Sequence, residues 1–201
     1  MHAEILAVNE DQLLADFDKI LQTLKVNFPE HGSTIGDHRR TDAVSETYAN
    51  QLQAMRFTLA NLRSGQPLPR LTGRDVHGVD FDSERLKGKA VLLFFASKQT
   101  IDWMDFNKLK ELKTIYAGRP FEIVSVMVDE KLEDAKSVVD TGIISWSTLY
   151  DADQQLMEKW RLGKCQETLL VDHQGIIHRR AYAGMELDQT IDQLVKNAES
   201  K

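Results

Sequence analysis

The sequence predicts an α/β fold preceded by a separate helical segment. Three observations support this: an apolar run over 91–95, an alternation of short strand-like and helix-like segments after residue 70, and prolines at 67 and 69. A strand that is apolar at every position is typical of a central strand covered on both faces. The prolines make the stretch before the α/β part stiff and extended. We therefore expect an N-terminal helical segment over 1–65 and an α/β domain over 66–201.

Two amphipathic helices are predicted in the N-terminal segment. Asn9 can cap a helix that ends near residue 27, and Thr41 can open a second one that stops by Ser64. Apolar residues recur in both with a spacing of three or four, at Leu13, Phe17, Ile20, Leu21 and Leu24 and at Val44, Tyr48, Leu52, Met55, Leu59 and Leu62. Two isolated helices bury too little surface to be stable. We expect this hairpin to pack on the α/β domain or to form a homodimer.

The α/β part is predicted element by element from its hydrophobic periodicity. The expected strands are 76–81 around a turn at His77 and Gly78, 91–95, 121–128, 148–150, 168–171 and 176–180. The expected helices are 102–116, 130–140, 154–160 and 187–197. The last two strands are joined by a short turn through Gln174 and Gly175, so the pattern ends in a hairpin and a helix.

Composition excludes several classes of function. The chain has 25 Lys and Arg against 31 Asp and Glu, a net charge of −6, and no long basic cluster, so nucleic acid is not an expected partner. No apolar run reaches the roughly 18 residues that a membrane span needs. The first ten residues lack the basic and apolar regions of a signal peptide. The protein is expected in the cytoplasm, or in an exported, periplasmic location if a signal has been removed.

The cysteine count restricts the chemistry further. Cys165 is the single cysteine of the chain, so neither an intrachain disulfide nor a cluster of thiolate metal ligands can form. The six histidines include no HExxH spacing and no i,i+4 pair on a predicted helix. We therefore expect no metal site and no cofactor.

Several segments, in their order and spacing, resemble the thioredoxin-like domains of the TlpA and AhpC/TSA type, over about 68–196. They are Leu68-Pro69, Asp75-Val76-His77-Gly78, Leu86-Lys87-Gly88-Lys89, Phe94-Phe95-Ala96-Ser97, Phe121-Glu122-Ile123-Val124-Ser125-Val126 with Asp129, and Leu170-Val171-Asp172-His173-Gln174-Gly175-Ile176-Ile177. The resemblance implies a thioredoxin-like, three-layer α/β/α sandwich that carries the N-terminal helical hairpin. It also implies a bacterial relationship, because the TlpA branch is commonly exported in bacteria.

The departures from the family pattern fall at its active site. Redox-active relatives carry a CxxC motif at the start of the first helix, where the helix dipole lowers the thiol pKa. One alignment register puts Gln99 and Asp102 at the two cysteine positions, and a register shifted by one puts Thr100 and Trp103 there. The resemblance further implies a cis-proline before the strand at 168–171, and that position holds Gln166. Both hallmarks of dithiol exchange are therefore missing.

Cys165 and Asp102 each have two interpretations. Cys165 lies beside the altered proline position, where it is a weak candidate for a catalytic thiol activated by Lys164, or a small buried hydrophobic residue. Asp102 is a candidate acid or metal ligand, or a carboxylate that stabilises the first turn of a helix.

Two functions of different classes follow. The first is a redox-inactive thioredoxin-like module that binds a protein or peptide partner without dithiol exchange. The alternative is an enzyme, a thiol-dependent oxidoreductase or peroxidase of the AhpC/TSA or TlpA type, that uses Cys165 with an external thiol. The missing CxxC favours the first, because dithiol exchange needs two thiols.

Overall fold

A computed structural model describes residues 10–27, 51–100, 106–151, 153–162, 167–180 and 185–200. The chain divides into two compact units, Met1–Ala60 and Asn61–Lys201. The boundary predicted from the prolines, between residues 65 and 66, stays a prediction. No helix among the described residues has both the length and the apolar content needed to cross a bilayer.

The N-terminal unit contains helix α1 (Glu10–Asn27) and residues 51–60 of a second helical stretch, which the structure describes over 51–61. Both fall within the helices predicted from the apolar spacing. The expected helix caps, Asn9 and Thr41, lie outside the described residues. Arg56 forms a bidentate ion pair with Asp18 of α1, with N–O distances of 2.5 and 3.2 Å, so the two helices of this unit are in contact.

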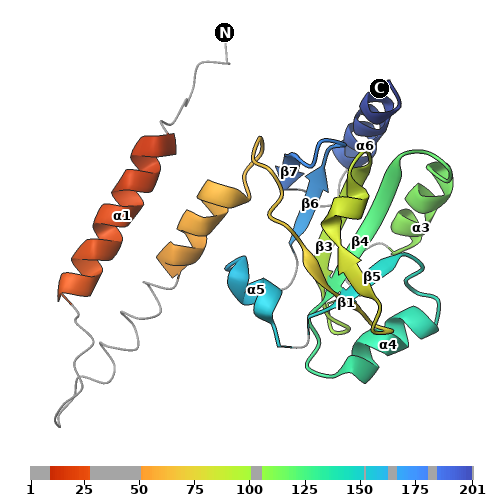
Figure 1. The fold of residues 1–201 in the computed structure, drawn as a ribbon, viewed down its shortest axis with the longest axis horizontal. Coiled ribbons are helices and arrows are strands. Elements are labelled where there is room, and N and C mark those ends of the chain that lie inside the picture. Colours follow the sequence, from red (N-terminus) through yellow and green to blue (C-terminus); the bar gives the residue numbers. More distant parts are fainter. Residues whose placement is uncertain are drawn as a thin grey trace. The chain divides into compact units, whose positions relative to one another are not determined.

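The second unit is built on one seven-stranded mixed sheet (Figure 1), with the order β2-β1-β5-β4-β3-β6-β7. The strands are β1 (Thr72–Asp75), β2 (Asp80–Asp82), β3 (Ala90–Ala96), β4 (Phe121–Met127), β5 (Ser147–Tyr150), β6 (Thr168–Val171) and β7 (Ile177–Arg180). Strands β3, β4 and β5 are parallel to one another, and the outer strands pair antiparallel. The helical elements are η1 (Ser83–Leu86), α3 (Phe106–Ile115), α4 (Leu132–Asp140), α5 (Gln155–Lys159) and α6 (Met185–Glu199).

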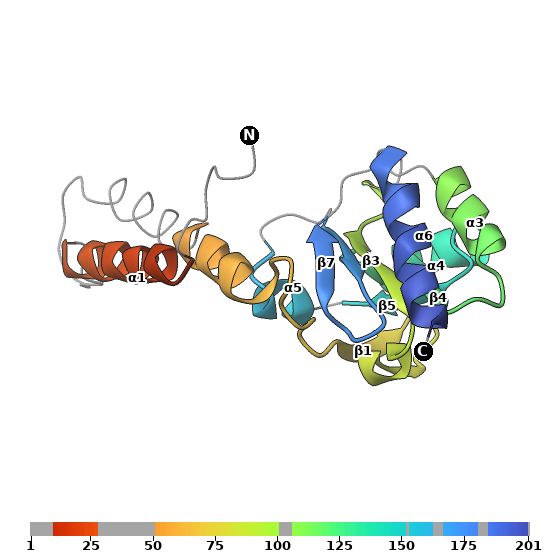
Figure 2. The ribbon, with the colours of Figure 1, turned by 90° about the horizontal axis from the view of Figure 1, so that it is seen from above.

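Helices cover both faces of this sheet. On one face, α3, α4 and α6 pack in a single buried cluster with Leu92 and Phe94 of β3. On the other face, Trp160 at the end of α5 contacts Phe95, with ring centroids 5.5 Å apart. Figure 2 shows α5 on the side of the sheet away from α3 and α6. Every residue of β3 is buried, as the apolar run predicted, and the three-layer α/β/α sandwich is confirmed.

The turn predicted at His77 and Gly78 is present, but the strands beside it have different bounds. The sequence predicts strand structure over 76–81 around this turn, whereas β1 ends at Asp75 and β2 spans Asp80–Asp82. The Asp75 carboxylate accepts hydrogen bonds from the N–H groups of His77 and Val79, both 2.8 Å long. Gly78 has a φ of +85°, which glycine adopts without strain. The side-chain bonds of Asp75 therefore stabilise a tight turn within an otherwise strand-like pattern.

Candidate functional site

The candidate site lies at the carboxyl end of β3, where the chain forms a hydrogen-bonded turn. The Ser97 N–H donates to Thr100 Oγ1 over 2.8 Å, and the Thr100 N–H donates to the Ser97 carbonyl over 3.0 Å. Thr100 is half-buried and Gln99 is exposed. Thr100 therefore stabilises the turn through its hydrogen bonds with Ser97, and Gln99 lies on the exposed surface of the turn.

The other four predicted site residues cannot be placed. Asp102, Trp103, Cys165 and Gln166 lie outside the described residues. Their roles as degenerate or weakly catalytic positions stay predictions.

Strand pairing brings the start of β6 beside the end of β3. Strand β6 runs antiparallel to β3, with Phe94 opposite Thr168. The Phe95 N–H donates to the Glu167 carbonyl over 2.8 Å. This bond holds Glu167, the residue before β6, beside the end of β3. The Glu167 carboxylate is bound by Arg180 of β7, with Nε 3.1 Å from Oε2.

Asp129 is a component that sequence reasoning did not assign to the site. It follows β4, and its Oδ1 accepts the Lys98 N–H over 2.8 Å. The residue is only 8% exposed. Its Oδ2 atom is buried and has no hydrogen-bond partner among the residues that the structure describes. Burial raises the pKa of this carboxyl group, because removal from water disfavours its charged form.

Lys98 ties this turn to α4 as well. Its ammonium group lies 2.9 Å from Asp134 Oδ1, in an exposed ion pair. The hydrogen bond from Lys98 is the main cause that lowers the pKa of Asp134. Lys98 thus contacts two carboxylates, Asp129 through its backbone and Asp134 through its side chain.

The carboxyl end of the sheet is acidic around Tyr150. Burial is the first cause that raises the pKa of the Tyr150 hydroxyl, and the negative charges of four neighbouring carboxylates add to it. These carboxylates belong to Asp129, Glu133, Asp153 and Asp134. Negative potential disfavours a second anion and attracts cationic groups.

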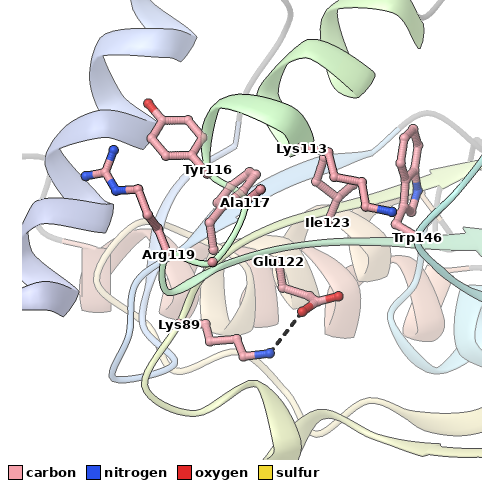
Figure 3. Close-up of a pocket in the computed structure, with 10 residues that line it drawn as sticks. Lys89, Lys113, Tyr116, Ala117, Arg119, Glu122, Ile123 and Trp146 are labelled. Atoms are coloured by element: carbon pink, nitrogen blue, oxygen red, sulfur yellow. Dashed lines mark hydrogen bonds and ion pairs between the residues drawn. The ribbon is translucent and has the colours of Figure 1, made fainter.

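A hollow of about 380 Å³ lies at the opposite edge of the sheet (Figure 3). It is bordered by the end of α3 and by the amino ends of β3, β4 and β5, through Lys89, Lys113, Tyr116, Ala117, Gly118, Arg119, Phe121, Glu122, Ile123 and Trp146. Two of its lysines make contacts within the domain. Lys89 pairs with Glu122 at 2.9 Å, and Lys113 donates to the Ser145 carbonyl. This hollow is therefore separate from the candidate site.

Strand order and helix placement together define a thioredoxin-like domain. The sequence matches the AhpC/TSA family over residues 64–180, which is more than half of the chain, and the protein belongs to that family. The comparison with curated proteins found no match.

Solved structures agree with this fold. The thioredoxin domain of a thiol-disulfide oxidoreductase from Bacteroides vulgatus is 24% identical, with a TM-score of 0.60 over 67% of this chain and 99% of that one. A thiol-disulfide oxidoreductase from Bacteroides fragilis is 19% identical, with a TM-score of 0.55 over 66% and 99%. A thiol:disulfide interchange protein of the thioredoxin family from Chlorobium tepidum is 19% identical, with a TM-score of 0.55 over 66% and 97%. At these identities the likeness concerns the fold alone.

Proposed function

We propose that this protein is a redox-degenerate member of its family, whose thioredoxin-like domain binds an extended protein or peptide segment without dithiol exchange. The observation that carries the proposal is the single cysteine of the chain, because a dithiol pair within one chain needs two. Relatives named as thiol-disulfide oxidoreductases share the fold. The turn after β3 holds Ser97, Lys98, Gln99 and Thr100, which offer hydrogen bonds and charge in place of thiols.

The charge of the site indicates the kind of segment that it binds. Four carboxylates raise the pKa of Tyr150 at the carboxyl end of the sheet, those of Asp129, Glu133, Asp134 and Asp153. Lys98 forms an ion pair with one of them, Asp134. A complementary segment carries positive charge, since opposite potentials across an interface favour association. We expect the extended segment to be lysine- or arginine-bearing.

The loss of dithiol exchange is tested by insulin reduction with dithiothreitol as the electron source. The wild-type protein and the Cys165→Ser variant are both expected to match the buffer control. Turnover well above that control that survives Cys165→Ser contradicts the loss of activity. Peroxide reduction with glutathione that disappears in Cys165→Ser supports the alternative, an enzyme that works with one thiol and an external partner.

Binding is tested with a short thiol-free peptide of alternating Val and Thr that carries lysines, and with a matched peptide that carries glutamates. We expect the lysine peptide to bind more tightly and to shift the amide NMR signals of Lys98 and Asp129. Gln99→Arg is expected to weaken this binding, because it adds a positive charge to the exposed surface of the turn.

Gln174→Arg is the matched control for this substitution. Gln174 is also exposed, but it lies in the β6–β7 turn beside Gly88, at the opposite edge of the sheet. The Gln174→Arg substitution makes the same change in net charge as Gln99→Arg, away from the candidate site. Equal effects of the two variants, or equal affinity for the two peptides, contradict the proposed recognition of a cationic segment at the end of β3.

A further inference from the structure

The apolar face of α1 is wider than a single partner helix covers. Apolar residues occupy three of the seven positions of each heptad, a pattern typical of helices in bundles, whereas a two-stranded coiled coil uses two. They are Leu13, Leu14, Phe17, Ile20, Leu21 and Leu24. A pattern of this width is typical of a helix that packs against more than one neighbouring helix.

The second helix of this unit also has an apolar seam, formed by Leu52, Met55 and Leu59 with the spacing of three and four residues. Seam positions on both helices remain open in one copy of the chain. Ile20 is 48% exposed and Met55 is 54% exposed. The two helices are nevertheless in contact, through the Arg56 and Asp18 ion pair.

Charge along α1 is divided between its two halves. Its first nine residues, 10–18, contain four acidic residues and no basic one. The last nine, 19–27, contain Lys19 and Lys25 and no acidic residue. Two such helices attract each other when they lie antiparallel, because each acidic half then meets a basic half.

The apolar positions match the same arrangement. If a two-fold axis passes through the midpoint of α1, position 13 of one copy faces position 24 of the other, and position 17 faces position 20. Each of these four positions holds an apolar residue. The same axis brings Asp18 opposite Lys19, and Asp11 within one helical turn of Lys25.

We propose that the N-terminal unit is a homodimerisation element, in which the α1 helices of two copies pack antiparallel and the two helical pairs form a four-helix bundle. The charges and the apolar layers of α1 are self-complementary, so the partner that they fit is a second copy of this chain. The proposal is independent of what the thioredoxin-like domain binds.

A charge exchange tests this pairing in the full-length chain. One variant carries Asp11→Lys and Asp16→Lys, and the other carries Lys19→Glu and Lys25→Glu; the Asp18 and Arg56 pair stays intact in both. Sedimentation equilibrium is expected to show a wild-type dimer. Each variant alone places like charges opposite each other, so its dimer dissociation constant is expected to rise at least about tenfold. An equimolar mixture of the two variants is expected to restore the dimer.

Asp140→Lys with Glu158→Lys is the control for the Asp11→Lys and Asp16→Lys variant, because it also replaces two acidic residues by lysines, at two exposed positions of the other unit. This control is expected to dimerise like the wild type. Circular dichroism of each variant checks that α1 remains helical, and recovery of the dimer on mixing excludes unfolding as the cause of dissociation. A monomeric wild type, variants that dimerise as the wild type does, or a mixture that stays monomeric would each overturn the proposal. A monomer with protected α1 amides would indicate docking on its own domain instead.

Discussion

At the candidate site, we expect the ionisation of Asp129 to make the free energy of unfolding depend on pH. Its folded-state pKa is raised, so the protonated group stabilises the fold below the ordinary pKa, and this contribution is lost as pH rises through the raised value. We expect the free energy of unfolding of the wild type to fall, relative to that of Asp129→Asn, as pH rises from about 4 to about 7. Urea unfolding at several pH values measures it.

Asp134→Asn is the natural control, because the pKa of Asp134 changes in the opposite direction. Its bond with Lys98 lowers the pKa, so the ionised group stabilises the fold above its ordinary pKa and loses that effect as pH falls. The wild type should therefore gain stability relative to Asp134→Asn as pH rises. The same sign of pH dependence in both comparisons would contradict the described environment of Asp129.

Two buried hydroxyl groups join β4 to β5. Ser125 Oγ and Thr148 Oγ1 lie 2.8 Å apart, and Thr148 also bonds to the Trp146 carbonyl over 3.1 Å. Thr148→Val keeps the shape of the side chain and leaves a buried Ser125 hydroxyl without this partner. We expect a loss of about 1–3 kcal/mol in the free energy of unfolding.

The double variant Ser125→Ala with Thr148→Val removes both hydroxyls. Since no unsatisfied partner of this pair remains, its loss should be smaller than the sum of the two single losses. Denaturant unfolding of the four proteins gives this coupling directly. Additive losses would mean that the two hydroxyls do not share a hydrogen bond.

At the scale of the element, α4 begins without a side-chain cap. Lys131 stands at the cap position with an extended backbone, φ −118° and ψ 130°, and makes no side-chain capping bond. Serine at that position can accept a hydrogen bond from the first turn of the helix. Lys131→Ser is therefore expected to raise the free energy of unfolding by about 0.5–2 kcal/mol.

Lys110→Ser in α3 controls for the change of residue type. Lys110 is exposed within the helix, where serine has a slightly lower helix propensity than lysine. This variant should be destabilised by a few tenths of a kcal/mol. If thermal or urea unfolding shows no gain for Lys131→Ser, the start of α4 does not lie where the backbone places it.

At the scale of the whole molecule, the first residues of the second unit belong to its fold. Leu62 is fully buried. The Gly65 N–H donates to the Ile177 carbonyl over 2.8 Å, and Ser64 Oγ donates to the His178 carbonyl over 2.6 Å. A fragment over 61–201 is expected to be more stable than one over 66–201, by about 2–5 kcal/mol, because the shorter one lacks Leu62 and these bonds.

Urea unfolding of the two fragments measures this difference, and amide exchange of β7 locates it. A fragment that starts at 62 and carries Leu62→Ala separates the contribution of the side chain from that of the backbone. Equal stability of the two fragments would instead support the boundary that the prolines predict, between residues 65 and 66.

The periodicity of the sequence determined the elements of the α/β domain. The apolar run at 91–95 predicted β3, and the patterns at 130–140 and 187–197 predicted α4 and α6 within a few residues. These predictions succeed because burial of one face or of a whole strand imposes a local repeat on the sequence. The turn at His77 and Gly78 was also predicted, but β1 ends before it because side-chain bonds of Asp75 stabilise the turn, and hydrophobic spacing does not record those bonds.

The sequence by itself also excluded a dithiol pair within the chain, because one cysteine cannot form such a pair however the chain folds. Only the tertiary structure decided which polar groups meet at the end of β3. Asp129 lies 31 residues from Lys98 in the chain, and Glu167 is far from Phe95, yet each pair shares a hydrogen bond. Local patterns carry no information on such contacts, because the order and register of the strands decide which strand ends become neighbours.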